Sequence, residues 1–169
     1  MPRTTQLGEG YRGPEGRIGY LLRQTIHAFN TAMERGLRAH GLSSAQYGAL
    51  FVLTEEPGLS SAELARAMGT TPQAANLLVG GMEQEGLVRR EPHPTHGRIL
   101  EIYATDEGNG RFLAAQPVIT GLEDLMSEGL GPWQLDVVKG WLVRSAQALA
   151  SAEATRRAPG ATGSPGRRG

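Results

Sequence analysis

The sequence predicts a mainly α-helical fold with one small β-hairpin, and three observations support this prediction. Apolar residues recur at helical spacing along residues 18–40 and 105–154, near the two ends of the chain. Between these stretches, serine and threonine residues precede short apolar segments in the pattern that begins helices. Two short apolar and β-branched runs, 87–90 and 99–103, then flank a loop. This order of elements is typical of a winged helix-turn-helix domain flanked by long helices.

Composition and charge narrow the possible classes of function. The 169 residues include 17 basic and 17 acidic residues, so the net charge of zero does not by itself indicate a nucleic-acid partner. The absence of cysteine excludes disulfide bonds, thiolate metal sites and thiol redox chemistry. No apolar run has the length of a signal peptide or a membrane span, so we expect a cytoplasmic protein without a membrane partner.

Long helices are expected on both sides of the central region. The first, from about Ile18 to His40, ends at Gly41 and carries one apolar stripe: Leu22, Ile26, Phe29, Met33 and Leu37. Thr105 caps the second, which continues to about Ala154 with a break and restart at Gly131-Pro132. The small central domain is too short to cover both stripes. Residues 18–42 and 105–153 are therefore predicted to form a homodimerisation region, with an intramolecular bundle as the alternative.

The two ends of the chain are predicted to be disordered. Residues 1–17 are mostly small and polar, and residues 154–169 combine glycine, proline and serine with arginine. Neither segment has an apolar anchor. They are interpreted as a polar N-terminal tail and a basic C-terminal tail.

Residues 43–104 are predicted to contain three short helices. Ser43 with Gln46 and Ser60 with Glu63 have the capping-box pattern, so each pair begins a helix. The third helix begins after Thr71 if Pro72 is its first residue, or after Thr70 if Gln73 closes a capping box, and both alternatives stay open. On a helical wheel, the apolar residues of this helix fall on one face, which is predicted to pack against the core: Ala75, Leu78, Val79 and Met82. The opposite face is predicted to point outward and contains Gln73, Leu77, Gly80, Gly81 and Gln84. Asn76 lies at the edge of this outward face.

A hairpin is expected to complete the domain. Residues 91–98 are too many for a tight turn between the strands 87–90 and 99–103, so they are predicted to form a wing. A helix-turn-helix with a wing places its last helix in the DNA major groove. The central domain is therefore predicted to bind double-stranded DNA.

Several short motifs resemble the MarR family of bacterial transcription regulators. They are Leu42-Ser43 with Gln46 and Leu50, Glu63-Leu64-Ala65, Met82-Glu83 with Gly86-Leu87-Val88 and Arg90, and Thr105 with Gly108. The resemblance covers about residues 18–153. It implies a homodimer that binds a pseudo-palindromic operator and represses nearby genes until a small aromatic or phenolic ligand releases it.

The candidate DNA contacts follow from the chemistry of the outward residues. The amides of Gln73 and Asn76 suit bidentate pairing with adenine, and Leu77 suits a thymine methyl, which predicts an A·T-containing half-site. Alternatively, Gln73 only closes the helix cap. The remaining candidates are expected at phosphates or in the minor groove, and they are Thr70, Thr71, Arg89, Arg90 and Arg98.

Two departures from the family pattern bear on this interface. The wing of the family usually carries Asp-x-Arg, whereas this chain has His96-Gly97-Arg98, so Arg98 lacks the acid that would orient it. The third helix has Leu77 where the family often has arginine, and Gly80-Gly81 where it often has polar or charged residues. These glycines either permit close approach of the backbone to DNA or are simply tolerated.

Ligand, metal and catalytic sites have weaker signals. Arg23, His27 and Tyr47 are the candidate ligand-binding residues, because the resemblance places a cleft between the dimerisation helices and the DNA-binding domain, and this cluster suits an aromatic carboxylate. Alternatively, they are a solvent-facing arginine, a satisfied histidine and a core tyrosine. His93 and His96 make a poor metal site, so no metal or cofactor is expected. No catalytic motif is visible, so no enzyme is expected.

Two other functions remain as alternatives. A winged-helix module that binds protein rather than DNA would fit the seven glutamates and four arginines of residues 43–104. A small-molecule binding protein, or the winged-helix part of an enzyme, is disfavoured because no cofactor domain follows. Arg98 and the Arg89-Arg90 pair discriminate between these hypotheses, since a DNA-binding protein needs them at phosphates.

Overall fold

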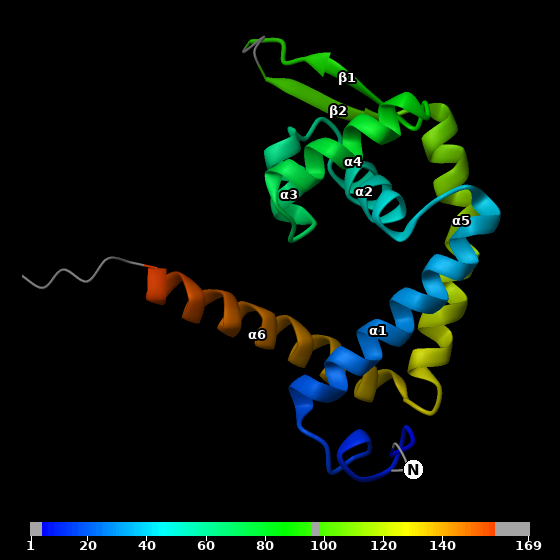
Figure 1. Cartoon of the computed structure of the whole chain (residues 1–169), viewed down its shortest axis with the longest axis vertical. Helices are drawn as coiled ribbons and strands as arrows, with labels where there is room; N and C mark the ends of the chain where they lie inside the picture. The colour runs from blue at the N-terminus through cyan, green and yellow to red at the C-terminus, as the bar shows by residue number, and fades with distance from the viewer. Residues whose placement is uncertain (1–4, 96–98, 158–169) are drawn as a thin grey trace, which may run out of the picture. The chain divides into compact units, whose positions relative to one another are not determined.

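The protein is described from a computed structural model that places residues 5–95 and 99–157 (Figure 1). The chain divides into two compact units, Met1–Leu125 and Met126–Gly169. The described residues form a mainly helical fold with an antiparallel hairpin, which confirms the predicted fold class. No helix in this described part is both long and apolar enough to cross a membrane.

The elements follow the predicted order. The helices are α1 (Ile18–Leu37), α2 (Ser44–Glu55), α3 (Ser61–Ala67), α4 (Pro72–Gln84), α5 (Asp106–Ser127) and α6 (Pro132–Arg157). The strands are β1 (Val88–Pro92) and β2 (Leu100–Ala104), and two short 3₁₀ turns are η1 (Gly10–Arg12) and η2 (Arg38–His40).

Hydroxyl side chains begin the helices of the central domain. The Ser43 hydroxyl accepts a hydrogen bond from the Gln46 backbone N–H at 3.2 Å, and the Gln46 side chain accepts one from the Ser43 N–H at 2.8 Å. Ser60 and Glu63 form the same capping box at α3, and these hydrogen bonds lower the pKa of the Glu63 carboxyl. Both predicted capping boxes are confirmed. Each satisfies backbone donors that a helix start leaves unpaired.

The ends of the long helices differ from the prediction in detail. Helix α1 stops at Leu37, because residues 38–40 tighten into η2 before Gly41, whose φ of 64° suits glycine. Helix α6 continues to Arg157, so residues 154–157 are helical rather than part of a disordered tail. Alanine and arginine, which are strong helix formers, dominate that stretch.

The N-terminal segment is also more ordered than predicted. Residues 10–12 form η1, and the Arg12 side chain donates hydrogen bonds to the Gln24 side chain and to the Thr5 carbonyl, each at 2.9 Å. The rings of Tyr11 and Tyr20 lie 5.6 Å apart. These contacts attach the segment to α1, and composition alone does not indicate them. The predicted tail residues 1–4 and 158–169 lie outside the described residues.

The hydrophobic core lies within the first unit, where α2, α3 and α4 gather beside the hairpin (Figure 1). Its large buried side chains come from six elements and from the turn before β1: Leu37, Leu50, Leu53, Leu64, Val79, Met82, Leu87, Ile102 and Phe112. The buried residues of α4 are those that the helical wheel predicted, with Leu78 half-buried at their edge. The core therefore fixes which face of α4 points outward.

Two helical glycines mark places where elements approach closely. A Cβ at Gly108 would collide with the Leu87 carbonyl oxygen, so the start of α5 lies against the backbone just before β1. A Cβ at Gly36 would collide with the Val118 side chain, so α1 approaches α5 closely at that point. Both contacts require the absence of a side chain.

The hairpin is joined to the helices through its backbone. β1 and β2 pair antiparallel from Val88–Ala104 to Pro92–Leu100, so β1 extends two residues into the predicted loop. Proline lacks an N–H and is tolerated there at the strand end. The Ile102 N–H donates to the Leu59 carbonyl at 2.9 Å, and the Gly58 N–H donates to the Ile102 carbonyl at 3.1 Å. The segment between α2 and α3 is thus bonded to β2.

Candidate nucleic-acid interface

The start of α4 decides between the two predicted caps. The Thr71 hydroxyl accepts a hydrogen bond from the Ala74 N–H at 3.2 Å, and Pro72 is the first helical residue. Gln73 is then the second residue, a position from which it closes no capping box. The interpretation of Gln73 as a cap residue is therefore wrong. Within the described chain its exposed side chain has no hydrogen-bond partner.

The outward face of α4 offers amides and one large apolar side chain. Gln73, Asn76 and Gln84 are exposed, and Leu77 is 74% exposed. The helix contains no lysine or arginine. Any recognition by this face therefore depends on hydrogen bonds from amides and on apolar contact rather than on charge.

The glycine pair of α4 is not required by packing within the described chain. Nothing lies within 4 Å of a Cβ placed on Gly80 or on Gly81. Gly108, in contrast, has no room for one. Internal packing therefore does not account for the pair, and both predicted explanations, close approach to DNA or simple tolerance, remain.

We expect Gly80→Ala and Gly81→Ala each to raise the free energy of unfolding by about 0.5–1 kcal/mol, because alanine restricts the unfolded chain and fits the helix. Urea denaturation at fixed protein concentration measures this. A lower stability would contradict the open space around both positions. The DNA affinity of the same variants separates the two explanations. If a variant is more stable but binds DNA more weakly, the glycine allows close approach of the α4 backbone to DNA. If the affinity is unchanged, the glycine is simply tolerated in the helix.

Arg89 is held at the base of the hairpin. Its Nε lies 2.7 Å from Glu91 Oε1, its Nη1 donates to the Ala104 carbonyl at 3.2 Å, and its guanidinium lies 5.1 Å from the centre of the Tyr103 ring. About half of the side chain is exposed. A phosphate contact by Arg89 would therefore compete with its ion pair to Glu91.

Arg90 is buried more deeply against the end of α4. Its side chain is 24% exposed, and its Nη1 lies 3.5 Å from Glu83 Oε2. Its Nε is buried and has no hydrogen-bond partner within the described chain. Arg89 and Arg90 thus both face acids of their own domain. The third predicted arginine, Arg98, lies outside the described residues, as does His96.

The wing also carries a polar cluster on β2. Tyr103 donates a hydrogen bond to Glu101 Oε2 at 2.8 Å, which raises the pKa of the Tyr103 phenol. His93 Nε2 lies 3.7 Å from Glu101 Oε1. Among the described residues, no group of three or more histidine and acidic side chains is arranged to hold a metal ion.

The predicted ligand-binding residues do not lie together. Arg23 and His27 line one pocket, against the N-terminal segment. Tyr47 lines another pocket, of about 430 Å³, between α1, α2 and α5, with the following neighbours: Phe29, Met33, Phe51, Gln116, Ile119, Thr120 and Glu123. Burial raises the pKa of the Tyr47 phenol, and the Glu123 carboxylate adds to this increase. The pocket is thus aromatic and contains an acid.

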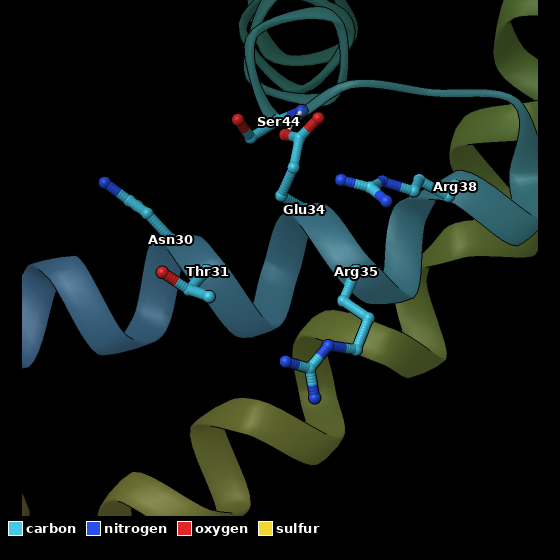
Figure 2. A pocket seen from close by; sticks show the side chains of 6 residues that line it. All are labelled: Asn30, Thr31, Glu34, Arg35, Arg38 and Ser44. Atoms are coloured by element: carbon cyan, nitrogen blue, oxygen red, sulfur yellow. Dashed lines mark hydrogen bonds between the residues drawn. The ribbon is translucent and has the colours of Figure 1, made fainter.

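A further pocket, of about 520 Å³, lies where α1 faces the start of α2 (Figure 2). Glu34 Oε2 accepts a hydrogen bond from the Ser44 N–H at 2.9 Å, and this bond lowers the pKa of the Glu34 carboxyl. Figure 2 shows Arg38 directed toward Glu34, whereas Arg35 points away from it. The positive charge of Arg38 also lowers the pKa of the Glu34 carboxyl, but less than the hydrogen bonds from Ser44 do.

The chain resembles known transcription regulators in sequence. Residues 40–99 match a family model described as the MarR family. The HTH-type transcriptional repressor Rv2887 of Mycobacterium tuberculosis is 34% identical over 102 residues, which cover 60% of this chain and 73% of the repressor.

Solved structures agree with this similarity. A structure of Rv2887 in complex with p-aminosalicylic acid has a TM-score of 0.62 and 28% identity over 78% of this chain and 99% of that one. The transcriptional repressor CouR, solved bound to a 23-mer DNA duplex, has a TM-score of 0.72 over 82% of this chain and 98% of that one, and its 22% identity shows a shared fold. These relatives are named as regulators, and none of them as an enzyme.

Proposed function

Since the chain belongs to the MarR family of transcription regulators, we propose that it is a homodimeric repressor that binds a pseudo-palindromic operator and is released by a small aromatic ligand. The observation that carries the proposal is the outward face of α4, where Gln73, Asn76 and Leu77 are exposed beside a hairpin wing. A helix presented in this way fits the major groove.

Recognition of bases is assigned to the first half of α4. The amides of Gln73 and Asn76 suit adenine, and Leu77 suits a thymine methyl, so we expect an A·T-containing half-site. Thr70, Thr71 and the α4 N-terminus are proposed to meet phosphate, because a helix start offers N–H groups and positive potential. The exposure of these side chains supports this assignment.

Gln73→Ala should change sequence preference more than affinity. The side chain lies outside the cap, so its removal takes away a base contact and leaves the helix start intact. We expect discrimination at one base pair to fall by about 1–3 kcal/mol. Competition with operators mutated one position at a time measures this, and an equal loss of affinity on all sequences would refute it.

Arg98→Ala should weaken binding to all sequences by about tenfold, because it removes a contact of the wing with the groove or its phosphates. The slope of log affinity against log salt should fall by about one. Arg17→Ala, on the N-terminal segment, is the matched control. An unchanged salt slope in Arg98→Ala would remove this residue from the interface.

Dimerisation is supported by the apolar surface of the terminal helices, each considered separately. On α1, Ile18 is 62% and Ile26 is 53% exposed, and on α6, Trp133 is 69% and Leu149 is 73% exposed. Such exposure of large apolar side chains indicates a contact surface. Light scattering of the purified protein should give twice the 18.0 kDa of one chain.

The Tyr47 pocket is proposed to hold the releasing ligand. Its aromatic walls suit a ring, and its acid, Glu123, suits a hydrogen-bond donor such as a phenol. A carboxylate placed there would be repelled by Glu123. We therefore expect phenols to release DNA more effectively than the corresponding benzoates.

Fluorescence anisotropy on the DNA upstream of the coding sequence, across a salt series and with scrambled competitor, tests the proposal. Tight, specific and steeply salt-dependent binding supports a repressor, and phenols can then be added to the same assay. Absence of specific binding on that DNA and on a library of random duplexes would refute it.

A protein-binding module is the second candidate function. The ion pairs of Arg89 and Arg90 with acids of their own domain, together with an α4 that lacks basic residues, favour it. Such a module would bind DNA at most weakly and without sequence preference, so the anisotropy experiment separates the two candidates.

A further inference from the structure

One side chain at the start of α2 bonds two helices at once. Gln46 Oε1 accepts a hydrogen bond from the Ser43 N–H at 2.8 Å, which completes the capping box of α2. Gln46 Nε2 donates a hydrogen bond to Glu85 Oε2 at 2.9 Å, and Glu85 is the C-cap residue of α4. The two ends of one amide therefore join the start of α2 to the end of α4.

The capping box of α3 shows that capping alone does not require an amide. The equivalent residue there is Glu63, whose carboxylate accepts hydrogen bonds from the Ser60 N–H at 2.9 Å and from the Ser60 hydroxyl at 2.7 Å. A carboxylate only accepts hydrogen bonds, whereas an amide also donates them. A glutamate at position 46 would also cap α2 but would not donate to Glu85. The bond to α4 is therefore a role of Gln46 beyond capping.

Glu85 has no cationic partner among the described residues. None of their salt bridges includes its carboxylate, which lies at the surface. A negative charge at the C-terminal end of a helix is disfavoured by the helix dipole. The helix end thus does not account for an acid at this position, whereas the hydrogen bond from Gln46 does.

The start of α2 is itself attached to α1. Glu34 Oε2 accepts a hydrogen bond from the Ser44 N–H at 2.9 Å, and Figure 2 shows the Glu34 side chain directed at this first residue of α2. In the core, Leu50 of α2 and Met82 of α4 are both completely buried. Apolar burial is non-directional, whereas a hydrogen bond has a preferred distance and angle. The polar bonds therefore add a directional constraint to the packing.

We propose that Gln46 is a positioning residue for DNA recognition, which holds the end of α4 in a fixed orientation without touching DNA itself. This role rests on the proposed function, because it concerns how α4 is presented to the major groove. Hydrogen bonds weaken steeply when their angle becomes poor. An α4 that is freed at its end would therefore present Gln73 and Asn76 to the bases with poorer geometry.

Glu85→Ala separates positioning from electrostatics, because the two predict opposite signs. Loss of a negative charge alone would strengthen binding to DNA phosphates. Loss of the bond from Gln46 should instead weaken affinity for the operator by about fivefold, as expected for one hydrogen bond. The matched control is Glu56→Ala, which removes an exposed C-cap acid of α2 whose carboxylate has no partner in the described chain. Fluorescence anisotropy measures both variants. Unchanged or tighter binding by Glu85→Ala, or an equal loss in Glu56→Ala, would overturn the proposal.

Exchanging donor and acceptor tests the bond directly. Gln46→Glu keeps an acceptor for the Ser43 N–H but places a second carboxylate beside Glu85, so it should weaken operator binding by about fivefold or more. In the double variant Gln46→Glu/Glu85→Gln, the new amide can donate to the new carboxylate, and the net charge equals that of the wild type. Wild-type affinity should return. Ala45→Glu adds the same charge at an exposed neighbouring position and should weaken binding less. A double variant as weak as Gln46→Glu, or an equal loss in Ala45→Glu, would contradict the role of the bond.

Hydrogen exchange provides a readout that does not need DNA. The Glu85 N–H donates to the Gly81 carbonyl at 3.0 Å in the last turn of α4. Its exchange should be faster in Gln46→Glu and should return to the wild-type rate in the double variant, whereas the N–H of residue 46 stays bonded to the Ser43 hydroxyl. Equal exchange in all three proteins would overturn the proposal. Absence of operator binding in the wild type would refute the repressor and this role together, whereas a wild type that binds and variants that match it would refute this role alone.

Discussion

Gly108→Ala is expected to lower the free energy of unfolding by about 3 kcal/mol, the upper range for overpacking a tight contact. The new Cβ would collide with the Leu87 carbonyl oxygen, which cannot move freely. That oxygen accepts a hydrogen bond from the Thr105 N–H at 3.0 Å, and the Leu87 side chain is completely buried. The start of α5 would have to move away from the hairpin.

Gly110→Ala is the matched control for this prediction. It lies two residues later in the same helix, and nothing lies within 4 Å of its added Cβ. We expect it to raise stability by up to about 1 kcal/mol, as alanine does in an exposed helix. Urea denaturation of both variants at one protein concentration is the measurement. Equal effects in the two variants would show that the contact with Leu87 is not tight.

Leu77→Glu is expected to reduce affinity for the operator by at least about 100-fold. The side chain is 74% exposed on the outward face of α4, so a carboxylate there would face the phosphates of the groove. The free energy of unfolding should change by less than about 0.5 kcal/mol, because the substitution is at the surface. Anisotropy and urea denaturation of the same sample measure the two effects.

Leu77→Gln separates charge from apolar contact in this experiment. It is polar but neutral, so it should retain most of the affinity and lose preference for thymine at one position. If Leu77→Glu binds the operator with wild-type affinity, α4 does not lie in the major groove. The protein-binding module would then become the better explanation of this exposed leucine.

Features that depend on neighbouring residues could be predicted from the sequence. The capping boxes at Ser43 and Ser60 involve residues three positions apart, so the sequence contains both partners. The N-cap of α4 could be narrowed only to Thr70 or Thr71, because the run Thr70-Thr71-Pro72-Gln73 fits either cap. The structure shows that Thr71 is the N-cap, because its side chain accepts a hydrogen bond from the Ala74 N–H.

Features that depend on register or packing could not be predicted. The bond between Leu59 and Ile102 joins segments far apart in the sequence. The ion pair of Arg90 depends on where the end of α4 meets β1. The predicted cluster of Arg23, His27 and Tyr47 does not form, because Tyr47 lines a different pocket from the other two residues. Which residues share a pocket depends on where α2 packs along α1, and the sequence does not show this position. Tyr47 lies near Phe29 and Met33 instead.

The backbone bonds between residues 58–59 and Ile102 have a consequence for regulation. Ile102 is also completely buried, so strand β2 of the hairpin is fixed by both hydrogen bonds and packing to the segment that precedes α3. The angle between wing and recognition helix is therefore set when the domain folds. If the protein is the dimeric repressor proposed above, we expect an effector to change the separation of the two DNA-binding domains along the DNA. Hydrogen exchange at the Ile102 amide should then stay equally slow with and without effector.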